Sequence, residues 1–158
     1  MICTKVVGHV HEGVAASRRL DRVWLHSEAL LKRIQRLRTE SGRELGLRLP
    51  ADSAALRDGD ILWMDDEAAV VVSVLPESVL VVSPKSLREM GEVAHRLGNR
   101  HVPAQFEGDT LIVADDPLLE QLFVSLEVPF VREERVLREP FRYIAEHGHG
   151  HSPGHGHA

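Results

Sequence analysis

The sequence predicts an α+β protein with a small all-β domain, a second domain of mixed strands and helices, and a histidine-rich tail. Short strand-like runs separated by turn signals fill residues 1–75. Residues 76–146 alternate strand and helix patterns in the order β-α-β-β-α-β, which is the ferredoxin-like pattern. Residues 147–158 contain only Gly, His, Ser, Pro and Ala and cannot bury a core, so we expect this tail to be disordered.

The first domain is predicted from short strands with turn signals at Ser41-Gly42 and Asp58-Gly59-Asp60. The predicted strands are Cys3–Val7, Val23–Leu25, Glu44–Leu49, Ile61–Met64 and Ala69–Leu75. A further stretch is ambiguous, because its apolar residues have the spacing of a helix and also fit a short turn followed by a strand. These residues are Leu30, Leu31, Ile34 and Leu37. We favour a short turn followed by a strand over Ile34–Thr39.

The second domain is predicted to begin with a Val-rich strand over Ser78–Ser83, followed by a helix. Ser86 and Glu89 have the spacing of a capping box, which starts a helix just after Pro84. Gly98 is well placed to end this helix because glycine tolerates the left-handed conformation. The predicted buried face of the helix is Leu87, Met90, Ala94 and Leu97.

A hairpin and a second helix complete this domain. The hairpin joins Ala104–Glu107 to Thr110–Ala114 through Gly108-Asp109. The dipeptide Asp116-Pro117 supplies an N-cap and a proline at the first helical position. A last strand is predicted over Val128–Val131. The second helix is expected to bury Leu118, Leu119, Leu122, Phe123 and Leu126.

Composition excludes several classes of function. The formal net charge of -5 argues against nucleic acid as the main partner, because phosphate binding needs an excess of Lys and Arg. The single cysteine, Cys3, allows no disulfide framework within the chain and is predicted to be a half-buried strand residue. No apolar run approaches the roughly 20 residues of a membrane span. No signal peptide is visible, so we expect a cytoplasmic location and no membrane partner.

Five of the ten histidines lie in the tail, at His147, His149, His151, His155 and His157. Neutral imidazole binds nickel, copper and zinc, whereas calcium and magnesium prefer oxygen ligands. Several histidines on one flexible segment raise the effective concentration of the second and third ligand. The tail is therefore predicted to bind Ni(II), Zn(II) or Cu(II), and its composition does not choose among them. An expression tag, or metal binding without a biological purpose, are the alternatives.

A short motif, Gly98-Asn99-Arg100-His101, lies between the first predicted helix of the second domain and the next strand. The surrounding segment HRLGNRHVPAQFEG, from His95 to Gly108, resembles the GNRH signature of the UreE family of urease accessory proteins. SGRELGLRLP, from Ser41 to Pro50, and LRDGDIL, from Leu56 to Leu62, are similar to the amino-terminal domain of that family. A histidine-rich carboxyl tail is also common in it, so the resemblance covers nearly the whole chain.

The resemblance implies a nickel metallochaperone for urease maturation, with Ni(II) as bound cargo and the GTPase UreG as a partner. It gives His101 the role of central metal ligand. It also implies a homodimer formed through residues 76–146, in which the two copies of His101 face each other across the two-fold axis. Such an axis converts one weak ligand into a facing pair, and tail histidines would complete the coordination. Residues 1–75 are the expected docking domain for the partner.

The chain departs from some relatives in the UreE family. A His-x-His pair that they carry is Asp115-Asp116-Pro117 here, where the two aspartates suit helix capping. Another histidine, five residues before that of the GNRH motif, is Arg96 here. The spacing of His9-Val10-His11 would place two imidazoles on one face of a strand. We favour surface or turn positions for the remaining histidines, His9, His11, His26 and His95. The alternatives are a weak copper or nickel site at His9 and His11, and a role as metal ligand for His95.

The stretch between Arg18 and Arg48 is basic, with nine Lys or Arg and four Asp or Glu. One interpretation is an ordinary solvated face. The other is a docking surface for an acidic partner, in which Arg36 and Arg38 would take part.

Three classes of function compete. A metallochaperone delivers nickel to a partner, whereas a buffer or storage protein for Ni, Zn or Cu needs only the tail. A metalloenzyme is the weakest of the three, because the sequence lacks H-E-x-x-H, a P-loop, a nucleophile elbow and a C-x-x-C pair. Catalytic metal sites also hold their ligands on fixed elements, whereas most histidines here lie on the tail. We therefore expect a protein without catalytic activity.

Overall fold

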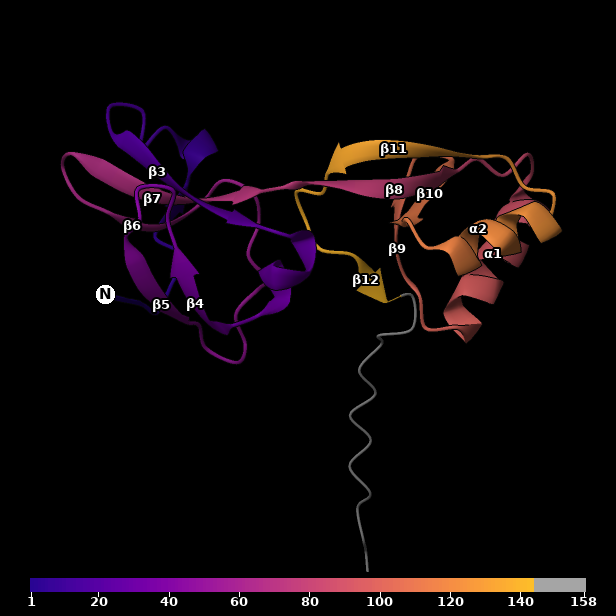
Figure 1. The fold of residues 1–158 in the computed structure, drawn as a ribbon, viewed down its shortest axis with the longest axis horizontal. Coiled ribbons are helices and arrows are strands. Elements are labelled where there is room, and N and C mark those ends of the chain that lie inside the picture. Colours follow the sequence, from indigo (N-terminus) through magenta and orange to yellow (C-terminus); the bar gives the residue numbers. More distant parts are fainter. Residues whose placement is uncertain (144–158) are drawn as a thin grey trace, which may run out of the picture.

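The structure is a computed structural model, and it describes residues 1–143. Figure 1 shows two lobes, one built from β1 to β7 and the other from β8 to β12 with both α-helices. The first lobe holds strands and short 3-10 helices, and the second mixes strands with helices. The α+β class is thereby confirmed. No helix of residues 1–143 is long and apolar enough to span a bilayer.

The first lobe consists of two sheets packed face to face. The larger sheet has the order β2 (Gly8–His9), β6 (Asp60–Met64), β7 (Ala68–Val74), β3 (Arg19–Leu25). The smaller sheet has the order β1 (Ile2–Cys3), β5 (Glu44–Arg48), β4 (Ile34–Arg38). Their inner faces meet in a core that includes Leu47, Leu62 and Val72. All seven residues of β7 are buried, because this strand lies inside its sheet and is covered on both faces.

Two short 3-10 helices interrupt the strands, η1 (Val10–Glu12) and η2 (Ser27–Leu31). The favoured strand after the ambiguous stretch is confirmed as β4, and Leu30 belongs to η2, where it is buried. The single strand predicted over Cys3–Val7 is wrong. Because β1 pairs with β5 while β2 pairs with β6, the chain crosses from one sheet to the other between them. Cys3 is fully inside the core rather than half-buried.

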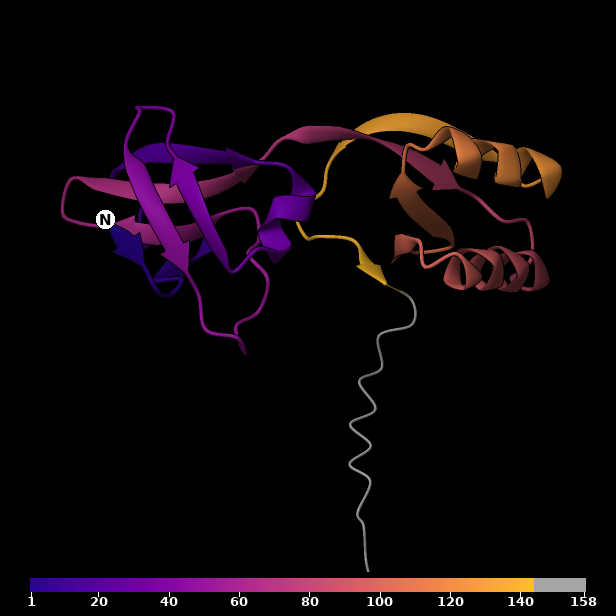
Figure 2. The ribbon, with the colours of Figure 1, turned by 60° about the horizontal axis from the view of Figure 1, so that its bottom comes forward.

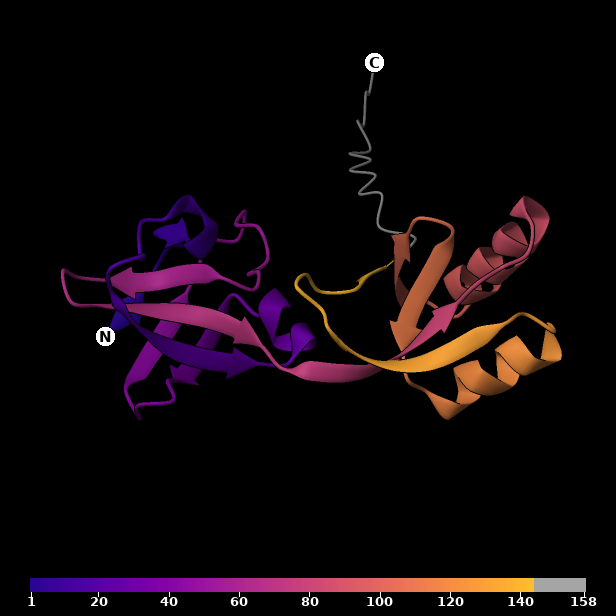
Figure 3. The same cartoon turned by 90° about the horizontal axis from the view of Figure 1, so that it is seen from above.

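The second lobe is one sheet with both helices on one face. The strand order is β11 (Phe130–Val136), β8 (Pro76–Val82), β10 (Thr110–Ala114), β9 (Pro103–Glu107), β12 (Arg142–Tyr143). Neighbouring strands are antiparallel throughout. Helices α1 (Leu87–Asn99) and α2 (Pro117–Ser125) lie at the end of the molecule away from the first lobe (Figures 1 and 3). Their buried side chains share one core with the sheet, including Val93, Leu97 and Phe123.

The opposite face of this sheet is covered by the chain that follows β11. Leu137 is buried against Val79, Val81 and Ile112, and Phe141 packs on the same cluster. The backbone of this segment is also held at two points, where Asp58 N donates to Arg138 O at 3.0 Å and Gln105 Nε2 donates to Glu139 O at 2.9 Å. The segment then enters β12, so the chain that leads to the tail is fixed on the sheet.

Two leucines predicted to be buried are exposed. Leu87 is 90% exposed and Leu118 is 70% exposed. At about 100° per residue, Leu87 lies about 80° around α1 from Leu97, and Leu118 lies about 100° around α2 from Leu119. Each therefore falls outside the stripe that faces the sheet. The last strand is also longer than predicted, since β11 continues to Val136 along the full length of β8.

Candidate metal site

The GNRH segment forms the carboxyl end of α1. The helix begins as expected, with Ser86 Oγ accepting a hydrogen bond from Glu89 N at 3.1 Å. The capping box is not completed, because Glu89 Oε2 accepts from Lys85 N rather than from Ser86 N. It does not end at Gly98, however, but continues to Asn99. Beyond it, His101 N donates to Gly98 O and Val102 N donates to Leu97 O, each at 3.1 Å. This pair of bonds is the Schellman motif, which satisfies the last carbonyl groups of the helix.

His101 occupies the left-handed position of this motif, with φ of 55°. Glycine is the usual residue there because a Cβ atom crowds the backbone. The side chain of His101 is exposed, and within residues 1–143 its ring makes no hydrogen bond. A strained backbone that holds an imidazole with both nitrogens free is typical of a functional position rather than a structural one.

A hollow of about 550 Å³ lies beside this turn, between it and the start of α2. Arg100 and Val102, the two neighbours of His101 in sequence, line it together with Asp116 and Leu118. The outer surface of α2 continues from the hollow as a stripe of exposed residues, Leu118, Gln121, Val124 and Ser125. The uncommitted imidazole is therefore next to a partly apolar helix face that no part of residues 1–143 covers.

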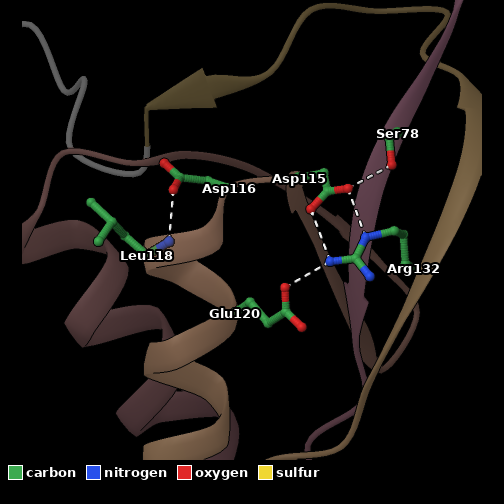
Figure 4. Close-up of polar contacts among 6 residues, drawn as sticks. All are labelled: Ser78, Asp115, Asp116, Leu118, Glu120 and Arg132. Carbon is green, nitrogen blue, oxygen red and sulfur yellow. Dashed lines mark hydrogen bonds and ion pairs between the residues drawn. The ribbon is translucent and has the colours of Figure 1, made fainter.

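The start of α2 is fixed to the sheet by a polar network (Figure 4). Asp116 Oδ1 caps the helix by accepting from Leu118 N at 2.8 Å. Arg132 on β11 donates to Asp115 Oδ2 and to Glu120 Oε2, both at 2.7 Å. The Arg132 guanidinium, together with the Ser78 hydroxyl, holds the pKa of Asp115 below its usual range. This network places Leu118 beside the His101 turn. No local pattern in the sequence indicated the part played by Arg132.

The predicted tail ligands, His147, His149, His151, His155 and His157, lie outside the described residues. The structure does fix the point from which the tail departs. Strand β12 pairs with β9 so that Tyr143 lies opposite Pro103, and Pro103 is two residues after His101. His147 follows Tyr143 by four positions in the sequence, and four extended residues span roughly 14 Å. That length would allow the first tail histidine to reach His101.

The other four histidines of residues 1–143 each lie in a helix or at its N-cap. His9 Nε2 contacts Asp58 O at 2.9 Å, and its Nδ1 accepts from His11 N at 3.2 Å, so both ring nitrogens are engaged. The one-strand geometry considered for this pair does not form, because His9 ends β2 and His11 belongs to η1. His95 is exposed, and its Nε2 lies 3.3 Å from Asn99 Nδ2. His26 occupies the N-cap position of η2.

One chain of residues 1–143 contains no group of three or more His, Cys, Asp or Glu side chains that could hold a metal ion. A stable site at His101 would therefore need ligands from elsewhere. The sources that the geometry leaves open are a second copy of the chain, packed against the exposed face, and the tail. Facing imidazoles would suit a borderline-soft divalent ion of the first transition series.

The fold and this site define a two-domain α+β protein that presents an uncommitted histidine at the end of a helix. Comparison with known proteins identifies its family. The family model described as UreE urease accessory protein, N-terminal domain, matches residues 3–75, and that of the C-terminal domain matches residues 77–158. The chain belongs to the UreE family of urease accessory proteins, so the resemblance seen in the sequence is confirmed.

Individual relatives agree over nearly the whole length. The urease accessory protein UreE of Geobacillus kaustophilus is 48% identical over 151 residues, which cover 96% of this chain and 99% of that protein. The UreE protein of Micrococcus luteus is 49% identical over 166 residues, which cover 94% of this chain and 100% of that protein. The UreE protein of Bacillus sp. (strain TB-90) is 46% identical over 151 residues. These names describe an accessory protein rather than urease itself.

Proposed function

We propose that this protein is a nickel metallochaperone that binds Ni(II) between the two subunits of a homodimer and delivers it for assembly of the urease active site. The observation that carries the proposal is the exposed imidazole of His101, free of hydrogen bonds in the described residues and held at a left-handed turn. Zn(II) and Cu(II) would compete, because imidazole also binds both. The protein would act in the cytoplasm without catalytic activity of its own.

The dimer would form through residues 76–146, the ferredoxin-like domain. A two-fold axis beside the His101 turn would bring two imidazoles together and would bury the exposed face of α2 against its copy. Leu118 and Val124, which are 70% and 63% exposed, supply the apolar contact for this interface. The arrangement also accounts for the incomplete site in one chain, since the second copy would supply a second His101 imidazole.

The tail would complete the coordination and capture the ion. Strand β12 tethers it two residues from His101 in the register of the sheet, so His147, His149, His151, His155 and His157 would act at high effective concentration. Ligands on a tether leave more easily than ligands on fixed elements, which suits a protein that must release its metal. Release would be made to the GTPase UreG and the urease maturation complex, which we propose dock on residues 1–75.

Nickel delivery separates this function from metal buffering. We expect the nickel-loaded protein, as the sole nickel source in the presence of a weak chelator, to activate apo-urease in a reconstituted mixture with its maturation proteins. His101→Ala should reduce this activation at least about tenfold even though the tail still binds nickel, because the tethered ligands alone have lost their fixed partner. The measurement is urease activity after a fixed incubation. Equal activation by the two proteins would favour a tail-based buffer.

A further inference from the structure

Strand β11 forms an open edge of the sheet in the second lobe. The order β11-β8-β10-β9-β12 leaves it with a neighbour on one side only, and it pairs with β8 over all seven residues without a register shift. In Figure 2 it runs along the upper margin of this lobe, on the side opposite β12. It contains neither a proline nor a β-bulge, two features that commonly block an open edge. The edge can therefore accept a further strand.

The backbone groups at this edge belong to every second residue of β11. Ser83 N donates to Pro129 O at 2.9 Å, so the odd-numbered residues of β11 bond to β8 and the even-numbered residues point away from it. On the other side of β8, Asp115 N donates to Ser78 O, which agrees with this alternation. Among residues 1–143, the outward N–H and C=O groups have no hydrogen-bond partner. They belong to Phe130, Arg132, Glu134 and Val136.

Two contacts of the chain limit the open stretch. Before β11, Val128 N donates to Phe123 O at 3.1 Å, which ties the chain to α2. After β11, Arg138 O accepts from Asp58 N at 3.0 Å, beyond the point where the chain leaves the edge to cover the sheet. An added strand is therefore limited to the four outward residues, which makes a short contact.

These four residues are complementary to a second copy of themselves. In an antiparallel pair, a two-fold axis at Glu133 would place Arg132 opposite Glu134 of the second copy. It would also place Phe130 opposite Val136 of the second copy. Each charge then meets its opposite and each apolar side chain meets an apolar one, which are favourable pairs across strands. The neighbouring registers that also join outward residues have the axis at Arg132 or at Glu134, and they bring like charges together.

The charged side chains are available for this pairing. The carboxylate of Glu134 is exposed and makes no hydrogen bond or ion pair within residues 1–143. Arg132 uses Nε and Nη2 for the two carboxylates near the start of α2, so its Nη1 has no partner in the described part of the chain. Glu133, which would face its own copy at the axis, is already compensated by Arg135 Nε at 2.7 Å.

We propose that two copies of the protein associate by pairing β11 with β11 about a two-fold axis at Glu133, which joins their second lobes into one continuous sheet. Main-chain hydrogen bonds hold the pair, and the contacts between Arg132 and Glu134 fix its register. So small an interface is weak and acts at high protein concentration. It lies at the opposite edge of the sheet from β12 and needs no metal, so it goes beyond the proposed function. Charges that only protect the edge from aggregation would give no defined register.

Single-cysteine substitutions test the register. The Cβ atoms of two Glu133→Cys chains would lie about 5 Å apart at the axis, which a small shift brings within disulfide distance. We expect this metal-free protein, oxidised by glutathione disulfide at high concentration, to form a linked dimer on non-reducing electrophoresis. The matched control is Val131→Cys, on the same face of β11 and more exposed, whose copies would lie about 14 Å apart and should not link. The native Cys3 is buried and should not react. Equal linkage of the two variants, or faster linkage of Glu134→Cys, would overturn the proposal.

The second test is sedimentation equilibrium of the metal-free protein at concentrations up to about 1 mM, because a contact of this size is weak. We expect the average mass to keep rising with concentration, whether the associating species is one chain or the proposed His101 dimer. Glu134→Lys should weaken this association at least about tenfold, because lysine would face Arg132 of the second copy. Asp109→Lys makes the same change of charge in the turn between β9 and β10 and should have no effect. A constant mass, or an equal effect of both substitutions, would contradict strand pairing. Nickel affinity should be unchanged in Glu134→Lys, so failure here leaves the metal site untouched.

Discussion

Replacing His101 with glycine is expected to abolish the tight nickel site and at the same time to stabilise the fold. Glycine relieves the Cβ crowding at φ of 55° and restores the usual residue of the Schellman motif. We expect the free energy of unfolding, from urea denaturation of the metal-free protein, to rise by about 0.5 to 1 kcal/mol. Nickel affinity, from calorimetric titration, should fall at least about a hundredfold, because the proposed site loses both of its His101 imidazoles together.

The matched control is His95→Gly, an exposed histidine inside α1 and six residues before His101. This residue lies inside α1, where glycine costs about 1 kcal/mol relative to a good helix former. The control should therefore lower the free energy of unfolding and leave nickel affinity unchanged. A His101→Gly protein that is less stable than the parent, or that binds nickel as tightly, would contradict the functional interpretation of the left-handed histidine.

Leu118→Asp is expected to dissociate the proposed dimer and thereby remove the proposed nickel site. An unpaired carboxylate buried in the proposed interface costs several kcal/mol, and the two-fold axis repeats that cost. The dissociation constant of the dimer, measured by analytical ultracentrifugation, should rise at least about a hundredfold. The fold of each chain should persist, because Leu118 is exposed and an acidic residue is favourable in the first turn of a helix.

Leu87→Asp is the control for this experiment. Leu87 is also an exposed leucine in the first turn of a helix. It lies at the opposite end of α1 from the His101 turn, about 18 Å along the helix axis. The dimer and its nickel affinity should therefore remain unchanged. A Leu118→Asp protein that remains a tight dimer would show that the interface does not use the start of α2.

The local signals of the sequence predicted most elements of the second lobe. Ser86 caps α1, Asp116 caps α2 and the Gly108 turn joins β9 to β10, each as predicted. Such signals depend on neighbours in the chain, so they can be read without the tertiary structure. His101 was singled out from the family motif, and its left-handed backbone could not be foreseen, because Gly98 three residues earlier is the better candidate for that conformation.

Features that depend on distant contacts could not be predicted. Strand β12 exists because Arg142 and Tyr143 pair with β9, and two residues are too few to show a strand pattern in the sequence. The exposure of Leu87 and Leu118 depends on the rotation of each helix about its own axis. The spacing of the leucines defines that rotation only approximately. The break between β1 and β2 likewise arises because the chain leaves one sheet after β1 and joins the other sheet at β2.

The central claim is that a nickel site exists at His101 on the dimer axis independently of the tail. The most direct measurement is a calorimetric nickel titration of the full-length protein with five substitutions in the tail, His147, His149, His151, His155 and His157 each to Ala. We predict that one nickel ion per two chains still binds tightly, and that adding His101→Ala removes this binding. Loss of all tight binding on tail substitution, together with normal affinity of His101→Ala in the intact chain, would contradict the account and leave the tail as the whole site.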